Sequence, residues 1–249
     1  MSPLMLITCC AVVILGAALQ RVAGMGMGLV AAPMLTLLLG PLVGVTMSNS
    51  VAVVAATLVM LATHQHVDWR RWLQMAPLLL IGTAAGTLAV DRISIAWLDV
   101  LVGLSVLLAL FVSFLMARTA TVRGGRPLAM GAGFAAGFMN TTSGVAAPAL
   151  TAYGLAIKWE QRSFAATLQP TFLVANVASL VAKAGTGAVP LTSLPAWWAT
   201  LILLAAVPVG VFIGRVLHSR TPVAVARGLG VAIALIGGVV AAVRGFIAI

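Results

Sequence analysis

The stretch QRVAGMGMG at residues 20–28 interrupts an otherwise apolar run that extends from Leu4 to Gly40. One continuous helix over residues 4–40 would be about 55 Å long, much longer than the ~30 Å hydrocarbon core of a membrane. We therefore expect the run to break where the glutamine, the arginine and the glycines stand. An ionisable side chain at the bilayer centre costs at least about 2.5–3.5 kcal/mol, so Arg21 lies at an edge or has a function there.

The composition is that of an all-α polytopic membrane protein. Hydrophobic residues make up 62% of the 249 residues and charged residues only 7%, against about a quarter in soluble proteins. The formal net charge is +10. These cations stand in short segments between apolar runs and form no patch interleaved with aromatics, so they indicate membrane topology and argue against nucleic-acid binding. We expect residues 1–249 to form one transmembrane domain in the cell (inner) membrane.

Ten apolar segments are bounded by charged residues, proline, glycine or tryptophan. They cover about residues 4–20, 28–40, 43–63, 73–90, 97–117, 128–140, 144–157, 164–182, 196–214 and 223–243. All six tryptophans lie at segment edges, as expected for amphipathic rings at the level of the lipid headgroups.

The chain repeats itself. GLVAAPMLT at residues 28–36 matches GVAAPALT at residues 144–151 with one residue deleted, and residues 86–92 resemble residues 210–215. We predict two homologous halves, about residues 4–117 and 128–246, each of which opens with a broken helix or hairpin pair. Each half then has five segments. Because five is odd, the second half is inverted relative to the first.

The distribution of cations favours this arrangement over eight plain crossings. With the hairpins, eleven of the 14 Lys and Arg residues lie on one side, leaving Arg92, Lys183 and Arg244 on the other. With eight crossings, seven basic residues lie on one side of the membrane and six on the other, which does not indicate an orientation. An inverted five-plus-five repeat, with both termini outside, lets one half rock against the other around a central site. Whether the short arms at 28–40 and 144–157 cross fully or re-enter stays open.

The two breaks are the candidate binding sites, because non-helical backbone at membrane depth lies in protein or lines a water-filled cavity. We expect them at residues 20–28 and 140–144, each before a helix start. Free N–H groups and the positive helix dipole would bind an anion there, and Ser143 would cap its helix. Arg21 would add a fork of donors suited to sulfite, sulfonate or carboxylate oxygens.

Other intramembrane polar groups complete the candidate site. Ser48 and Asn49 lie at a depth comparable to that of Gln169 in the matching segment, and Asn176 lies about two turns farther on. The candidate substrate-binding residues are Arg21, Gln20, Gly24, Gly26, Gly28, Ser48, Asn49, Asn140, Thr141, Thr142, Ser143 and Gln169. Alternative roles are close helix packing for the glycines, a topology charge for Arg21, and interhelical bonds of ~0.6 kcal/mol for the amides.

We expect neither a metal nor a cofactor. His64 and His66 are two residues apart, which turns their imidazoles away from each other on a helix. The phosphate loop, the dinucleotide fingerprint and the nucleophile elbow are absent from the sequence. The four acids fall near segment ends, so no carboxylate proton relay is visible, although proton or ion coupling stays open.

Several of these residues together resemble a known family. Gly16, Gln20, the GMGMG run at 24–28, Pro33 and HVDWR at 66–70 resemble the first half of the sulfite exporter TauE/SafE family. GFAAGF at 133–138, followed by Ser143-Gly144 and Pro148, resembles its second half. The family's motif positions map onto Gly24, Gly26, Gly28, Pro33, Gly137, Gly144 and Pro148. Residues 140–142, Asn-Thr-Thr, depart from the glycine-rich turn that many members have.

The resemblance implies a permease for small anions such as sulfite, organosulfonates or related carboxylates. We therefore expect a secondary transporter, with export as the direction, and a site between the two broken hairpins. Its partners would be the small anion and membrane lipid; the oligomeric state is open. Two alternatives are an intramembrane enzyme with Ser143 or Thr142 as nucleophile, for which no base is visible nearby, and a non-transporting membrane subunit.

Overall fold

The computed structural model describes residues 1–24, 27–116, 125–218 and 222–248. Within these ranges the chain forms ten α-helices and two short 3-10 turns, with no β-strand. The predicted all-α class and the ten apolar segments are confirmed; most helices extend a few residues beyond the predicted segments, whereas the helix predicted at 144–157 covers only residues 147–156. The helices are α1 Pro3–Ala23, α2 Met27–Leu39, α3 Pro41–Thr63, α4 Trp69–Arg92, α5 Ile95–Met116, α6 Arg126–Ser143, α7 Ala147–Ala156, α8 Gln161–Thr186, α9 Trp197–His218 and α10 Val223–Ile247.

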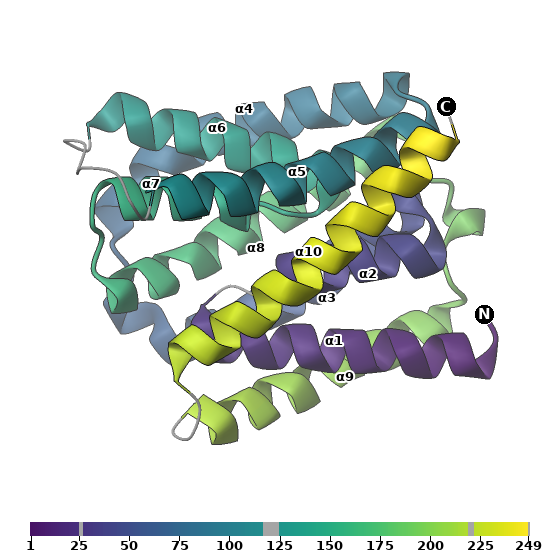
Figure 1. The fold of residues 1–249 in the computed structure, drawn as a ribbon, viewed down its shortest axis with the longest axis horizontal. Helices are drawn as coiled ribbons and strands as arrows, with labels where there is room; N and C mark the ends of the chain where they lie inside the picture. Colours follow the sequence, from purple (N-terminus) through teal and green to yellow (C-terminus); the bar gives the residue numbers. More distant parts are fainter. Residues whose placement is uncertain (25–26, 117–124, 219–221, 249) are drawn as a thin grey trace.

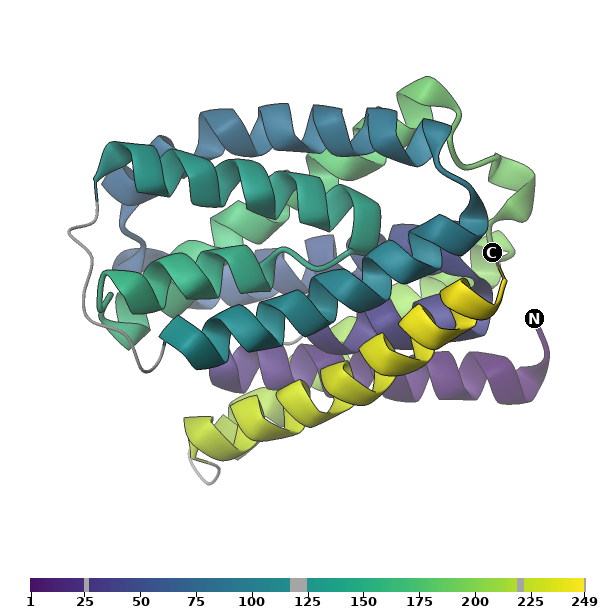
Figure 2. The ribbon, with the colours of Figure 1, turned by 45° about the horizontal axis from the view of Figure 1, so that its top comes forward.

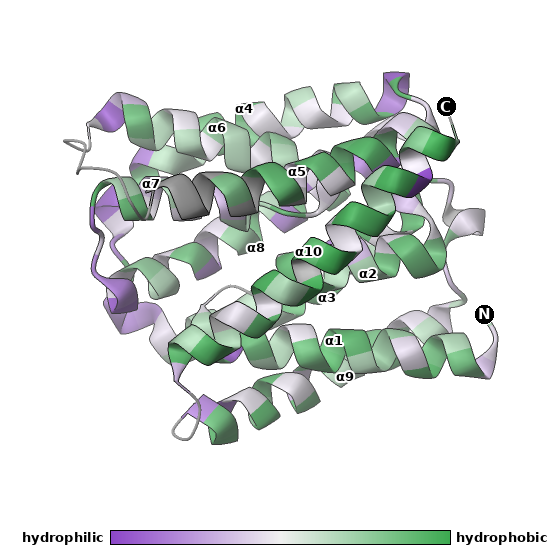
Figure 3. Ribbon diagram, viewed as in Figure 1, coloured by the Kyte–Doolittle hydropathy of each residue, from purple (hydrophilic) through white to green (hydrophobic). Residues whose placement is uncertain are grey.

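The helices have the length and polarity of membrane spans. Among the described residues, α1, α3, α4, α8, α9 and α10 are long and apolar enough to cross a bilayer. In contrast, α2 has 13 residues and α7 has 10, which correspond to about 20 and 15 Å. Figure 3 shows that the helix bodies are mainly apolar and that strongly polar residues gather at helix ends. The chain is a multi-pass membrane protein.

The helices are paired in a pattern that exchanges the two halves of the chain. Helix α1 packs on α9 just as its counterpart α6 packs on α4, and α2 packs on α10 as α7 packs on α5. Helices α3 and α8 contact each other, as do α5 and α10, which converge toward the C-terminal end of α10 in Figure 1 and run side by side in Figure 2. Both termini lie at the same end of the molecule. This pairing is what two related halves would produce; the inverted orientation of the second half stays a prediction.

Glycines allow the closest helix contacts. A Cβ on Gly133 would collide with the carbonyl oxygen of Met75, and one on Gly137 with that of Leu79, so α6 lies directly against the α4 backbone. The same close approach occurs between α9 and α1, where a Cβ on Gly210 would meet the Ile14 carbonyl oxygen. Small residues that let backbones approach are a main source of helix association in membranes.

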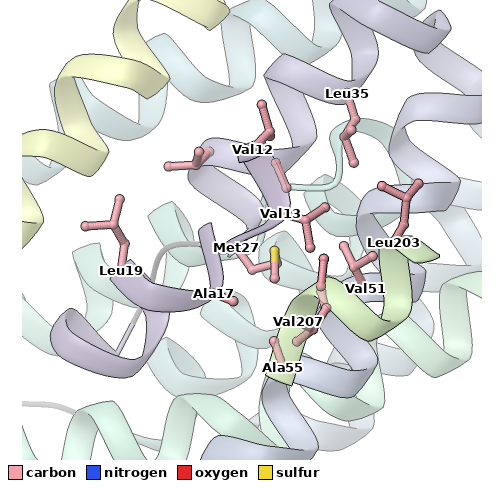
Figure 4. Packing of buried hydrophobic residues seen from close by; sticks show 14 of the residues in the cluster. Val12, Val13, Ala17, Leu19, Met27, Leu35, Val51, Ala55, Leu203 and Val207 are labelled. Atoms are coloured by element: carbon pink, nitrogen blue, oxygen red, sulfur yellow. The ribbon is translucent and has the colours of Figure 1, made fainter. Parts of the chain in front are cut away.

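A buried apolar cluster positions the first break. Val13 of α1, Met27 of α2 and Val51 of α3 pack with Leu203 and Val207 of α9 (Figure 4). All five side chains are buried. Because Met27 begins α2, this cluster holds the helix that follows the break against the helix that precedes it.

An ion pair joins the two halves at the end of the molecule that holds the termini. Arg244 of α10 donates from Nε and Nη2 to the two carboxylate oxygens of Asp99 in α5, both at 2.8 Å. The same guanidinium donates to the carbonyl oxygens of Thr36 and Leu37 at 3.3 Å. These carbonyls belong to the last turn of α2, so Arg244 also caps that short helix.

Candidate functional site

Both breaks are narrower than the sequence predicted. Helix α1 continues through Gln20 and Arg21 and ends at Gly24, whose φ is 80° and whose N–H donates to the Gln20 carbonyl oxygen at 2.9 Å. Helix α6 likewise continues through Asn140 and ends at Gly144, with φ 72° and an N–H bond of 2.9 Å to the Asn140 carbonyl oxygen. In each case a left-handed glycine ends the helix, as such residues commonly do. The predicted site residue Gly26 lies outside the described residues.

The predicted helix cap at Ser143 is wrong. The Ser143 hydroxyl donates to the Met139 carbonyl oxygen at 2.6 Å, inside the last turn of α6. Helix α7 starts three residues after Gly144, and its N-cap residue Ala146 makes no side-chain cap bond. Thr141 and Thr142 donate to carbonyl oxygens of their own helix in the same way. Thr141, Thr142 and Ser143 therefore bond within the last turns of α6, before the break, and Ser143 does not cap α7.

The two breaks lie against each other. A Cβ on Gly28, in the first turn of α2, would lie 2.8 Å from the carbonyl oxygen of Gly144. A Cβ on Gly144 would lie 2.8 Å from the Cβ of Ala32 in α2. The backbone of the second break thus touches the start of the helix that follows the first. Segments that are 116 residues apart in sequence meet because a glycine stands at each contact.

One face of α8 binds three different helices through buried side chains. Gln169, Asn176 and Ser179, the α8 polar face, are seven and then three residues apart, so they share an arc of about 80°. All of these side chains and their partners are buried. The bonds are Gln20 Nε2 to Gln169 Oε1 at 2.9 Å, Asn140 Nδ2 to Asn176 Oδ1 at 3.1 Å, and Asn49 Nδ2 to Ser179 Oγ at 2.9 Å.

Gln169 also holds the end of α1. Its Nε2 donates to the carbonyl oxygen of Gly24 at 3.0 Å and to that of Ala165 at 2.9 Å. The first bond pairs one of the carbonyls that the end of α1 leaves without an intrahelical donor. A Cβ on Gly24 would lie 2.5 Å from the Ala165 Cβ, so α8 and the first break are in direct contact.

A cavity of about 510 Å³, here called the Arg21 cavity, opens beside the first break. Arg21 of α1 and Arg162 of α8 lie on its wall, and Gln20 and Gln169 line it as well. Its other lining side chains include His66, Glu160 and His218. Two guanidinium groups and one carboxylate leave the wall with a net positive charge of one, with the histidines counted as neutral.

Glu160 caps α8 at the mouth of this cavity. Its carboxylate accepts the N–H of Ser163 at 2.7 Å and that of Arg162 at 2.9 Å. These backbone bonds, the Ser163 bond first, hold the pKa of Glu160 below its ordinary value of 4.5. The carboxylate is therefore ionised at neutral pH and serves as a helix cap, which leaves Arg21 and Arg162 to attract an anion.

A second, much smaller void lies between the two breaks. Its volume is about 20 Å³, enough for about one water molecule. It is lined by Gln20, Met27, Gly28, Ala52, Asn140, Gly144, Ala146, Ala147, Phe172 and Asn176. Gln20 therefore borders both this void and the Arg21 cavity, and it is bonded to Gln169, which lines the Arg21 cavity.

Two predicted residues of α3 carry unpaired polar atoms. Ser48 Oγ and Asn49 Oδ1 are buried, and neither has a hydrogen-bond partner in the described part of the chain. Buried polar atoms without partners cost about 1–3 kcal/mol each. These two atoms are free to bind a water or a solute that enters the centre of the molecule.

The structure brings most of the predicted residues together and adds others. Gln20, Gly28, Asn140 and Asn49 lie around the breaks, whereas Thr141, Thr142 and Ser143 bond their own helix. Apart from Asn176, which the sequence analysis named without listing it as substrate-binding, the structure adds His66, Glu160, Arg162, Ser179 and His218. A helical spacing from Gln169 through Asn176 and Ser179 to Lys183 was visible in the sequence and would have identified the face of α8.

A scan against protein-family models identifies the family of this chain. The model described as "Sulfite exporter TauE/SafE" matches residues 9–241. The chain belongs to this family. The resemblance first seen in Gly24, Pro33 and Pro148 is confirmed, and the chain, like the TauE/SafE family, is a multi-pass membrane transporter. Searches of curated proteins and of solved structures each found no match.

Proposed function

We propose that this TauE/SafE protein moves a small oxyanion, such as sulfite, an organosulfonate or a related carboxylate, along the α8 polar face. The observation that carries the proposal is the Gln20–Gln169 bond of 2.9 Å between the Arg21 cavity and the void at the breaks. The anion enters beside Arg21 and passes the breaks by replacing side-chain bonds one at a time.

The chemistry of the Arg21 cavity suits a small oxyanion. Guanidinium groups bind sulfite, sulfonate and carboxylate oxygens through parallel N–H donors, and such charge-assisted bonds are about twice as strong as neutral ones. A volume of about 510 Å³ is in the range of small-ligand sites. The amide side chains of Gln20 and Gln169 then offer neutral donors where a fixed charge would hold the anion too tightly.

The distribution of cations supports export as the proposed direction. Arg21 and Arg162 lie at the end of the molecule that we predict to carry eleven of the 14 basic residues. The positive-inside rule puts this end in the cytoplasm. The Arg21 cavity therefore opens to the cytoplasm, and an exporter would load its substrate there. Rocking of one half against the other would open the opposite end.

The amide bonds to α8 suit such a movement. Each side-chain bond between membrane helices contributes only ~0.6 kcal/mol on average, so three of them can be exchanged for bonds to a passing anion at low cost. An intramembrane enzyme would instead need a base for Ser143 or Thr142. Both hydroxyls donate to carbonyl oxygens within α6, which supports a structural role.

Anion flux into proteoliposomes tests the proposal. Uptake of sulfite, sulfoacetate, taurine and small carboxylates is compared for the wild type, Arg21→Ala, Arg21→Lys and the control Arg70→Ala. Arg70 is exposed and does not line the cavity. We expect Arg21→Ala to lower flux at least tenfold, Arg21→Lys to keep part of it, and Arg70→Ala to leave it unchanged. Unaltered flux in Arg21→Ala would remove Arg21 from the site, and no flux of any anion by the wild type would contradict the proposed function.

A further inference from the structure

Lys183 continues the line of the α8 polar face toward the other end of the molecule. It follows Ser179 by four residues and lies within the same arc of the helix. Its side chain is buried, with 3% of the residue exposed. Along α8 it is 21 residues from Arg162, or about 32 Å, so it lies at the membrane edge opposite the Arg21 cavity.

Lys183 lines a cavity of about 660 Å³, here called the Lys183 cavity. Thr46 and Ser50 of α3 contribute hydroxyl groups to the wall, and Thr200 of α9 contributes another. The other lining residues are mainly apolar, among them Met47, Leu194 and Trp197. The three hydroxyls donate to backbone carbonyl oxygens, so Lys183 is the group of this wall that can donate to an anion.

Within the described residues, the Lys183 ammonium has neither an ion pair nor a hydrogen bond. Asp91, an acid at this end, accepts a long bond of 3.5 Å from Thr186. The ion pairs of the described chain join Asp68 to Arg71 and Asp99 to Arg244. A buried charge is stable when it is paired, so a lysine held in a cavity without a partner is suited to bind an anion.

We infer that Lys183 is the oxyanion-binding group of a second vestibule, which receives the anion on the side opposite Arg21. The inference rests on the proposed function, because it places the second vestibule at the far end of the same path. The chemistry that Lys183 recognises is a small oxyanion. A free sulfite and the phosphate of a lipid headgroup both offer it, and the inference assigns the site to the free anion.

Reaction rates of a cysteine in the cavity wall test this inference without any transport. Ser50→Cys is introduced after Cys9→Ala and Cys10→Ala remove the native thiols. The purified protein in dodecyl maltoside, which contains no phosphate, is treated with an anionic sulfonatoethyl or a cationic trimethylammonioethyl methanethiosulfonate. Adding Lys183→Gln should lower the anionic-to-cationic rate ratio about tenfold, because the ammonium attracts one reagent and repels the other. Arg92→Gln, a control at an exposed cation of the same end, should leave the ratio unchanged.

Added ligands then distinguish the sources of the oxyanion. Sulfoacetate, a sulfonate that does not react with methanethiosulfonates, should slow the anionic reagent in the Lys183 protein and have no effect after Lys183→Gln. A ratio that does not depend on Lys183, or protection by added phospholipid but not by sulfoacetate, would overturn the inference. Because labelling needs no flux, a lysine-dependent ratio with sulfoacetate protection in a protein that transports nothing would refute the proposed function alone. Sulfite flux with a lysine-independent ratio would refute this inference alone.

Discussion

Gln169 makes the side-chain bonds that join three elements around the first break. Its amide accepts from Gln20 and donates to the carbonyl oxygens of Gly24 and Ala165, so one side chain joins α1, the first break and α8. Within the described part of the chain, the Gln20 side chain makes one hydrogen bond, to Gln169. Removing the Gln169 side chain therefore breaks three hydrogen bonds, whereas removing the Gln20 side chain breaks one.

Gln169→Leu should consequently destabilise the protein more than Gln20→Leu. The first change leaves both the Gly24 carbonyl oxygen and the Gln20 amide without this partner, whereas the second leaves only Gln169 Oε1 without its donor. Each buried polar group left unpaired costs about 1–3 kcal/mol. Thermal unfolding midpoints in detergent at one scan rate would measure the difference. Equal midpoints for the two variants would contradict the assigned network.

The sequence predicted the residues of this site better than their roles. Gln20, Asn140 and Gln169 were selected because polar groups at membrane depth need partners, but the partners themselves lie 36 to 149 residues away. Gly24, Gly26 and Gly28 are equally able to end a helix. The choice of Gly24 depends on Ala165 of α8, which packs against it, and no local pattern shows that contact.

At the scale of elements, α2 and α7 are the short helices that follow the two breaks. Apolar runs and their boundary residues predicted all ten helices, because hydropathy and glycine or proline act locally. The start of α7 was misplaced, since the sequence does not show that Gly144 adopts φ 72° while Ser143 still bonds within α6. Helix α2 depends on the glycine contact at Gly28, where the other break touches it.

Gly28→Ala should therefore destabilise the protein, in contrast to a matched glycine in an open position. The new methyl carbon would lie 2.8 Å from the Gly144 carbonyl oxygen, and overpacking of this kind costs about 1–3 kcal/mol. Gly131 of α6 is exposed and has nothing within 4 Å, so Gly131→Ala should stabilise the helix by about 0.5–1 kcal/mol. Opposite shifts in the unfolding midpoint are expected; a neutral Gly28→Ala would refute the tight contact.

At the scale of the whole molecule, the halves are joined by α1 against α9, α4 against α6, α3 against α8 and α5 against α10. The shared GLVAAP-like motif predicted the two halves. Arg244 was interpreted only as one of the cations that indicate membrane topology. Its pairing with Asp99, 145 residues away, is a long-range contact that no local signal reveals. The predicted inversion of the second half awaits a measurement of topology.

The Asp99–Arg244 pair should show strong energetic coupling. Arg244→Leu leaves Asp99 buried without its partner and removes the cap from α2. Breaking buried pairs costs about 3–5 kcal/mol, and the part-exposed Arg244 side chain lowers this to about 1–3 kcal/mol. The double variant Asp99→Leu/Arg244→Leu should lose clearly less than the sum of the single variants. Additive losses would show that the pair does not hold α5, α10 and α2 together.

The central claim is that the anion travels along one face of α8, and cysteine accessibility on that helix tests it most directly. Asn176→Cys and Ser179→Cys report on the polar face, and Val177→Cys and Val181→Cys on the exposed, lipid-side face. In proteoliposomes of the Cys9→Ala/Cys10→Ala protein, the polar-face cysteines should react with the anionic methanethiosulfonate and be protected by sulfoacetate, which does not itself react with the reagent. The lipid-face cysteines should show no sulfoacetate protection. Equal behaviour of the two faces, or polar-face cysteines that never react, would contradict the account.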